Sequence, residues 1–180
     1  QAAFYMTFIT GVLHALCKEG ESSISLLSKV NDLFLKNAPR GTFISLIFGI
    51  IDSETGDFLF SRAGHNPLFH FHAASKTVET VKPAGIGIGM TNAEIFSENI
   101  QESRLKLESG DYLILFTDGV TEANNEHGNQ FGEKKLQDII ESCKKKSAKE
   151  MMFGILEKVQ LYSEKTDQHD DMTLVVIKME

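Results

Sequence analysis

The spacing of apolar residues changes along the chain, and this change constrains the fold more than any other feature. Apolar positions recur at three and four in residues 5–16, and a second helical stretch begins near Ser22 or Ser23 and stops before Pro39. Short apolar runs joined by turn residues come next, which predicts strands at residues 42–51, 58–63, 68–72, 77–81, roughly 96–107 and 112–117. These short runs indicate an antiparallel arrangement.

Helical spacing returns after residue 118. One predicted helix buries Leu136, Ile139, Ile140 and Cys143, and the next begins with a capping box formed by Ser147 and Glu150. A strand at residues 172–178 closes the chain. The order of helices and strands therefore indicates an α+β fold, in which antiparallel sheet is covered by helices.

Length and composition limit the class of protein. A chain of 180 residues is predicted to form one domain, residues 1–180. Its 18 basic and 25 acidic residues give a net charge of -7, which argues against a general nucleic-acid binder. The basic run at residues 144–146 is interpreted as a solvated helix end.

Two further features predict where the protein is found. Cys17 and Cys143 form no CxxC pair and are predicted to lie on apolar helix faces, which favours a reducing compartment. No apolar stretch is long enough to span a bilayer, and no signal peptide is visible. We therefore expect a cytoplasmic protein with no membrane segment in this chain.

Acidic residues stand at two predicted strand ends. Asp118 ends the strand at 112–117, and Asp170 and Asp171 precede the strand at 172–178. If those strands are antiparallel neighbours, the carboxylates converge at one rim of the sheet, where they would suit Mg²⁺ or Mn²⁺. Acidic turns that face solvent are an equal alternative on spacing alone.

Several motifs resemble a known family. TDGVTE at residues 117–122, NEHGNQFG ending at residue 132, and DDMTLVVI at residues 170–177 resemble the closing motifs of the metal-dependent protein phosphatases, the PPM or protein phosphatase 2C-like family. AGHNP at residues 63–67, the GDYLILFTDGV block and the opening AAFYM are similar to the bacterial SpoIIE/RsbU-type branch.

The resemblance implies a fold and a reaction. The fold would be an antiparallel β-sandwich flanked by helices (αββα), with a two-metal Mg²⁺ or Mn²⁺ centre at one end. In that family a metal-activated water attacks phosphoserine or phosphothreonine in line, and no phosphoenzyme forms. By motif matching, Asp118 and Asp170 correspond to catalytic metal ligands, and Asp171 falls where relatives carry an accessory Asp or Asn.

Three residues are predicted to support these carboxylates: Gly119, Glu122 and Thr173. Gly119 is expected to let the backbone turn tightly beside the metal. Glu122 could position a water near the metals, or it could be a solvated loop carboxylate.

The chain departs from the family pattern at its beginning. Relatives carry an Asp-containing, glycine-rich motif just before the AA-x-x-M helix, and its aspartate bridges both metals. We expect that aspartate and the first strands to be absent from the 180 residues, which would then bind metal weakly and show little activity, although the full-length protein would be an enzyme. A sheet edge left unpaired would favour a homodimer.

The resemblance also implies partners. The substrate would be a small phosphorylated regulator, such as the antagonist of an anti-sigma factor, and an upstream sensor would control the phosphatase. The alternative is a non-catalytic module with the same fold that binds a phosphoprotein or dimerises. Asp118 and Asp170 count against that alternative, because such a module has no physical need for paired acids.

Other candidates have simpler interpretations. His65 could act as a general acid, but a turn residue is the favoured interpretation. His70 and His72 share a strand face and could bind a metal, but cross-strand packing is favoured because no third ligand is apparent. The glycine alternation at residues 83–90 lacks the helix that a dinucleotide site needs, so flexibility is favoured.

Overall fold

The computed structural model describes residues 2–17, 22–142, 147–166 and 170–180. The predictions for Cys143 and for residues 144–146 lie outside these ranges. The chain divides into two compact units: Gln1–His65 with Pro83–Lys106, and Asn66–Lys82 with Leu107–Glu180. A single domain over residues 1–180 stays a prediction.

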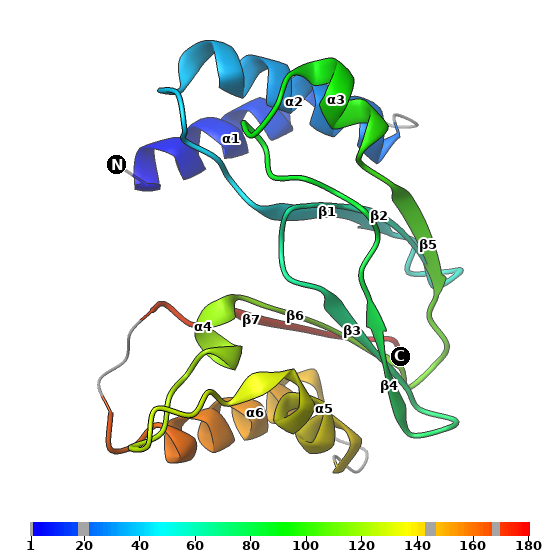
Figure 1. The fold of residues 1–180 in the computed structure, drawn as a ribbon. Helices are drawn as coiled ribbons and strands as arrows, with labels where there is room; N and C mark the ends of the chain where they lie inside the picture. The colour runs from blue at the N-terminus through cyan, green and yellow to red at the C-terminus, as the bar shows by residue number, and fades with distance from the viewer. Residues whose placement is uncertain (1, 18–21, 143–146, 167–169) are drawn as a thin grey trace. The chain divides into compact units, whose positions relative to one another are not determined.

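The first unit packs three helices on one face of a three-stranded antiparallel sheet with strand order β1-β2-β5 (Figure 1). Its elements are α1 (Ala2–Leu16), α2 (Ser23–Asn37), β1 (Leu46–Ile51), β2 (Asp57–Ala63), α3 (Ala93–Glu98) and β5 (Glu102–Lys106). The Ser22 side chain accepts the Ser25 N–H and caps α2, as the sequence predicts. Phe34 is fully buried in the core of this unit.

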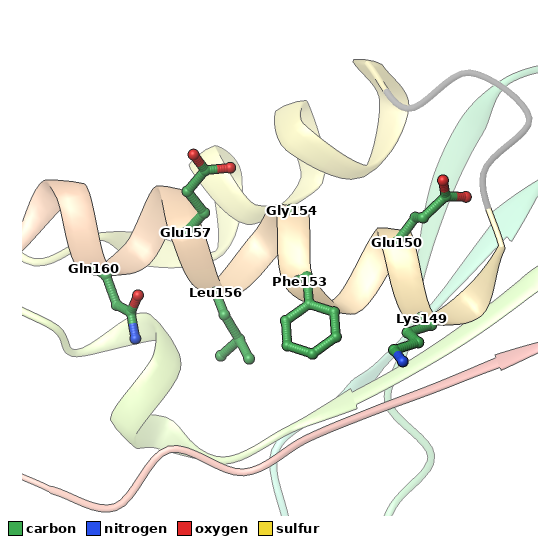
Figure 2. A pocket seen from close by; sticks show the side chains of 7 residues that line it. All are labelled: Lys149, Glu150, Phe153, Gly154, Leu156, Glu157 and Gln160. Carbon is green, nitrogen blue, oxygen red and sulfur yellow. The ribbon is translucent and has the colours of Figure 1, made fainter.

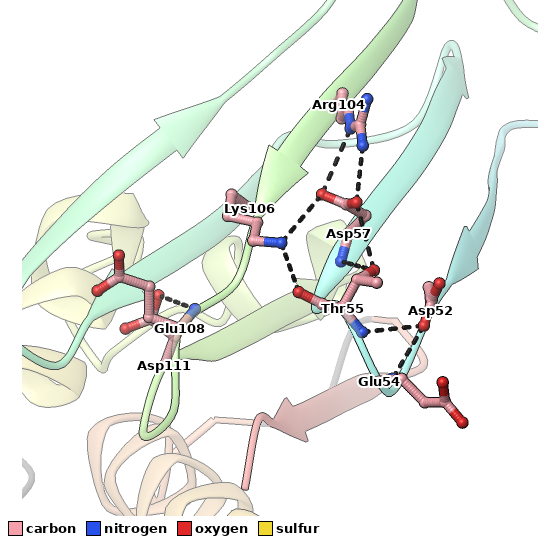
Figure 3. Close-up of polar contacts among 8 residues, drawn as sticks. All are labelled: Asp52, Glu54, Thr55, Asp57, Arg104, Lys106, Glu108 and Asp111. Carbon is pink, nitrogen blue, oxygen red and sulfur yellow. Dashed lines mark hydrogen bonds and ion pairs between the residues drawn. The ribbon is translucent and has the colours of Figure 1, made fainter.

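The β1–β2 turn is held by polar contacts (Figure 3). The carboxylate of Asp52 accepts the backbone N–H groups of Glu54 and Thr55 at 2.9 and 3.0 Å, and these bonds lower its pKa. Arg104 on β5 donates to Asp57 on β2 at 2.7 Å, and this bond is the main cause of the lowered pKa of Asp57. The turn chemistry expected after residue 51 is therefore present.

The predicted strand at residues 96–107 is partly wrong. Residues 93–98 form α3, because the Asn92 side chain caps the Ile95 N–H at 2.9 Å and the helix buries Phe96. The strand β5 begins only at Glu102. The first predicted strand is also shorter than expected, since β1 begins at Leu46.

The second unit is a four-stranded antiparallel sheet, with strand order β4-β3-β6-β7, whose one face is covered by α5 and α6 (Figure 1). Its elements are β3 (Leu68–His72), β4 (Thr77–Val81), β6 (Tyr112–Phe116), α4 (Asp118–Thr121), α5 (Gly132–Ser142), α6 (Ala148–Tyr162) and β7 (Leu174–Lys178). The core lies between sheet and helices, where Phe69, Ile114, Leu136 and Ile155 are fully buried.

These findings confirm the α+β class, with two antiparallel sheets flanked by helices. The capping box of α6 is also confirmed, since Ser147 accepts the Glu150 N–H and Glu150 accepts the Ser147 N–H. Cys17 was wrongly placed on an apolar face, because it lies exposed just after α1. Among the residues that the structure describes, no helix has the length and apolar character needed to cross a membrane.

Candidate active site

Asp118 follows a central strand of the sheet in the second unit. Strand β6 pairs with β3 on one side and β7 on the other, and four of its five residues are buried. Phe116, the last residue of β6, packs against Phe69 with ring centroids 4.8 Å apart. Helix α4 starts at Asp118 itself, so the backbone of this residue is held between β6 and α4 (Figure 1).

Asp170 and Asp171 reach the same rim from the other direction. Strands β6 and β7 are antiparallel, and Phe116 lies opposite Leu174. The segment that enters β7 therefore passes beside the end of β6. The predicted strand pairing that brings Asp118 near Asp170 and Asp171 is thus confirmed, while the catalytic and metal-binding roles of these residues stay predictions.

Thr117 links the two segments, although no sequence pattern singled it out. Its hydroxyl donates to the Asp171 carbonyl at 3.2 Å and accepts the Thr173 N–H at 2.9 Å. Its own N–H donates to the Thr173 carbonyl at 3.0 Å. Thr173 therefore contacts Thr117 through its backbone, and its supporting role stays a prediction. The Thr117 side chain continues the β6–β7 pairing past the last strand residues.

Gly119 is needed for close approach between the segments. A Cβ at this position would lie 2.5 Å from the Asp171 carbonyl oxygen and 3.4 Å from the Asp170 carbonyl oxygen. Its φ is not positive, so the tight turn that the sequence predicted is not the reason for glycine here. The reason is that only a residue without a side chain lets the Asp171 backbone come so close.

The carboxylates are exposed, and each accepts the N–H of the residue that follows it. Asp118 accepts the Gly119 N–H at 3.0 Å, and Asp170 accepts the Asp171 N–H at 2.8 Å. Glu122 is also exposed, and its N–H donates to the Asp118 carbonyl at 2.7 Å, which closes α4. Either interpretation of the Glu122 side chain, water positioning or solvation, is compatible with this placement.

The donor set fits a hydrated hard cation. Mg²⁺ keeps several waters and needs only one or two protein carboxylates, which Asp118 and Asp170 can offer from one rim. Over the described ranges, these aspartates do not form a group of three ligands as tight as His70, His72 and Glu79, whose ligand atoms lie within 4.8 Å of one another. The rim is therefore an open, water-accessible site rather than an enclosed cage.

A groove elsewhere in the second unit follows α6 (Figure 2). Phe153 and Leu156 point to the same side of the helix, and Glu157 points to the opposite side. None of the predicted site residues is among those that line it: Lys149, Glu150, Phe153, Gly154, Leu156, Glu157 and Gln160. The groove is thus separate from the carboxylate rim.

The histidines differ in their surroundings. His70 is buried and its Nε2 lies 2.9 Å from Asp111, while His72 is half-exposed and its Nε2 lies 3.1 Å from Glu79 on β4. Burial by itself would raise the pKa of Asp111, but hydrogen bonds from the backbone of Ala73 and Glu108 and from His70 outweigh it and lower the pKa. Glu79 is the third side chain with a ligand atom near His70 and His72, which the sequence did not reveal.

Comparison with known proteins agrees with this arrangement. The chain is 29% identical to the phosphoserine phosphatase RsbU of Bacillus subtilis over 178 residues, which cover 98% of this chain and 51% of RsbU. The chain thus spans about half the length of that relative.

Two solved structures have the same fold. The SiaA-PP2C domain of Pseudomonas aeruginosa matches with a TM-score of 0.77 at 18% identity, over 96% of this chain and 66% of that one. The Mn-presoaked phosphatase domain of the cell-fate determinant SpoIIE from Bacillus subtilis matches with a TM-score of 0.63 at 20% identity, over 98% of this chain and 72% of that one.

The family model for stage II sporulation protein E (SpoIIE) matches residues 1–180, the whole chain. The two antiparallel sheets with helices and the acidic rim at the end of β6 agree with the resemblance found in the motifs. The chain therefore belongs to the SpoIIE family.

Proposed function

We propose that this chain is the phosphatase domain of a protein that hydrolyses phosphoserine or phosphothreonine with the help of Mg²⁺ or Mn²⁺. The observation that carries the proposal is the pairing of β6 with β7, which places Asp118 beside the segment of Asp170 and Asp171. The family membership supports the reaction class, and RsbU is a phosphoserine phosphatase.

The proposed metal ligands are Asp118 and Asp170, with Asp171 as an accessory carboxylate. Metal bound there would lower the pKa of a water and offset the charge of a phosphoryl group. The protein's part is positioning. Thr117 and Gly119 hold the two segments at a fixed separation, and the buried strand β6 keeps Asp118 from moving away from Asp170.

The substrate in this proposal is a phosphorylated regulatory protein of the anti-anti-sigma type, acted on in the cytoplasm. The exposed carboxylates support a large substrate, because a phosphorylated side chain on a folded partner can reach them from solvent. An upstream sensor domain and homodimer formation complete the proposal. Exposed Phe4 and Met6 on α1 are apolar surface that such a dimer could cover.

The direct test is hydrolysis of p-nitrophenyl phosphate and of a phosphoserine peptide, with and without Mn²⁺, in the 180-residue chain and in any longer form of the protein. Asp118→Asn and Asp170→Asn should each lower the Mn²⁺-dependent rate by more than about 100-fold, because each removes a charged ligand. Asp138→Asn is the matched control, since Asp138 lies on α5 in an exposed ion pair with Lys134.

A second readout separates metal binding from catalysis. Titration of Mn²⁺ followed by electron paramagnetic resonance should show weaker binding in Asp118→Asn and Asp170→Asn than in the control. The same titration tests the expectation that these 180 residues bind metal weakly by themselves. Folded protein that shows no Mn²⁺-dependent hydrolysis in any form would refute the proposal and favour the phosphoprotein-binding alternative.

A further inference from the structure

Three metal-ligand side chains gather on the β3–β4 hairpin. His70 and His72 alternate with Phe69 and Phe71 along β3, so they lie on the sheet face opposite the helix-covered core. Glu79 on β4 lies directly opposite His70 in the strand register. The two imidazole ring centroids are 3.9 Å apart, and one ligand atom from each of the three residues lies within 4.8 Å of the others.

Asp111 fixes the orientation of the His70 ring. Its carboxylate accepts the Ala73 N–H at 2.8 Å and the Glu108 N–H at 3.0 Å, the second of which is drawn in Figure 3. A carboxylate held by two backbone donors acts as an acceptor, so the His70 Nε2, at 2.9 Å, is the donor. In the neutral ring, the lone pair is then on Nδ1.

That Nδ1 atom is buried and makes no hydrogen bond with any residue that the structure describes. His70 itself is only 2% exposed. A buried polar atom without a partner is unfavourable, and each such atom needs an explanation. A histidine that donates one ring N–H to a carboxylate and presents its other nitrogen is the usual arrangement of a metal ligand with its supporting group.

The distances between the candidate ligand atoms suit a small coordination sphere. Ligand atoms around tetrahedral Zn²⁺ lie about 3.3 Å apart, as follows from bond lengths of about 2.0–2.1 Å. The His72 Nε2 and Glu79 Oε2 atoms are already 3.1 Å apart. His72 and Glu79 are 37% and 55% exposed, so their side chains can rotate to close the remaining distance.

We propose that His70, through Nδ1, together with His72 and Glu79 binds a zinc-type divalent transition-metal ion, with water in the fourth position. Two imidazoles and one carboxylate favour Zn²⁺ or Co²⁺ over Mg²⁺, which prefers oxygen ligands. The site shares no residue with the rim of Asp118 and Asp170. It would join β3 to β4 through their side chains and so stabilise the hairpin.

Co²⁺ is the probe for this site, because tetrahedral Co²⁺ with nitrogen ligands absorbs visible light strongly and octahedral Co²⁺ with oxygen ligands absorbs weakly. Titration of the chelator-treated chain should give strong bands that saturate at one equivalent and disappear when Zn²⁺ is added. His72→Gln and Glu79→Gln should each weaken Co²⁺ binding at least tenfold. Neither side chain is buried, so the variants should still fold.

His127→Gln is the matched control, because His127 also lies beside a glutamate, Glu126, at 3.8 Å but is exposed on a loop. It should bind Co²⁺ like the wild type, and so should Asp118→Asn. Long-range ¹H–¹⁵N spectra should show that Zn²⁺ shifts the Nδ1 resonance of His70. Absence of strong Co²⁺ bands, or equal binding by wild type and His72→Gln, would overturn the proposal.

Discussion

Replacing Gly119 with alanine tests how the candidate active site is held together. The new Cβ would lie 2.5 Å from the Asp171 carbonyl oxygen and 2.9 Å from its carbonyl carbon. Ordinary contact begins at 3.4 Å, so the backbone at Asp171 must move by about 0.9 Å relative to Gly119. Backbone displacement of this kind, caused by an added methyl group, costs about 1–3 kcal/mol of folding free energy.

The same displacement should affect activity more than stability. Thr117 donates to the Asp171 carbonyl and accepts the Thr173 N–H, so movement of Asp171 strains both hydrogen bonds. A shift of about 1 Å in a reacting geometry can cost about 100-fold in rate. We therefore predict that Gly119→Ala unfolds at lower urea concentration and loses about 100-fold in Mn²⁺-dependent hydrolysis under conditions where it is fully folded.

Gly11→Ala is the control, because it makes the same chemical change but is expected to stabilise the fold rather than destabilise it. Gly11 lies within α1, and a Cβ there would meet nothing within 4 Å. Alanine should stabilise a helix interior by about 0.5–1 kcal/mol relative to glycine. If Gly119→Ala unfolds at the wild-type urea concentration and keeps its rate, close approach at Gly119 is not what positions Asp171.

Three further predictions concern the scaffold. Asn31→Leu should cost about 1–3 kcal/mol in urea unfolding, because Asn31 is fully buried and its loss leaves the part-buried Gly89 N–H, now bonded at 2.8 Å, without this acceptor. Ser147→Ala should cost about 1 kcal/mol in thermal unfolding, since it removes the cap of α6. Asp57 should titrate by NMR below its ordinary pKa. The ionised Asp57 stabilises the fold above its unfolded-state pKa of about 3.9, and this stabilisation is lost as pH falls through the lower folded-state pKa. Arg104→Gln should remove most of this stabilisation.

The fold was predicted best where turn residues separate short apolar runs. The strands at 68–72 and 77–81 were predicted to the residue, because the small and polar residues at 73–76 separate them. The failure at 96–107 has a physical cause. Phe96 and Ile100 are four apart and both buried, a spacing that fits a helix, and Asn92 gives the capping signal that was overlooked.

The candidate site was predictable only in part. The acidic residues stood out because each one ends or precedes an apolar run, and the β6–β7 pairing brings them together. Thr117 could not be singled out, since its hydroxyl acts only when residues 171–173 lie beside it. The sequence could not show why residue 119 is a glycine either, because the close approach of the Asp171 backbone leaves no pattern in the residues around Gly119.

The metal site proposed on the hairpin depends on strand register, which can be tested without changing composition. Register places Glu79 opposite His70, while the next residue, Thr80, points to the other face and accepts the Gln137 side chain of α5 at 2.8 Å. Exchanging the two residues, in Glu79→Thr with Thr80→Glu, keeps the net charge and moves the carboxylate to the helix side of the sheet.

The exchanged chain should bind Co²⁺ as weakly as Glu79→Gln does, because His70 and His72 by themselves supply only two ligands. Its circular dichroism should stay that of the wild type, since both residues are at exposed positions. A variant with Thr80→Glu alone keeps Glu79 and should bind Co²⁺ normally, which controls for the new charge near α5. Wild-type affinity in the exchanged chain would mean that charge near the histidines, rather than a carboxylate held opposite His70 by register, determines binding.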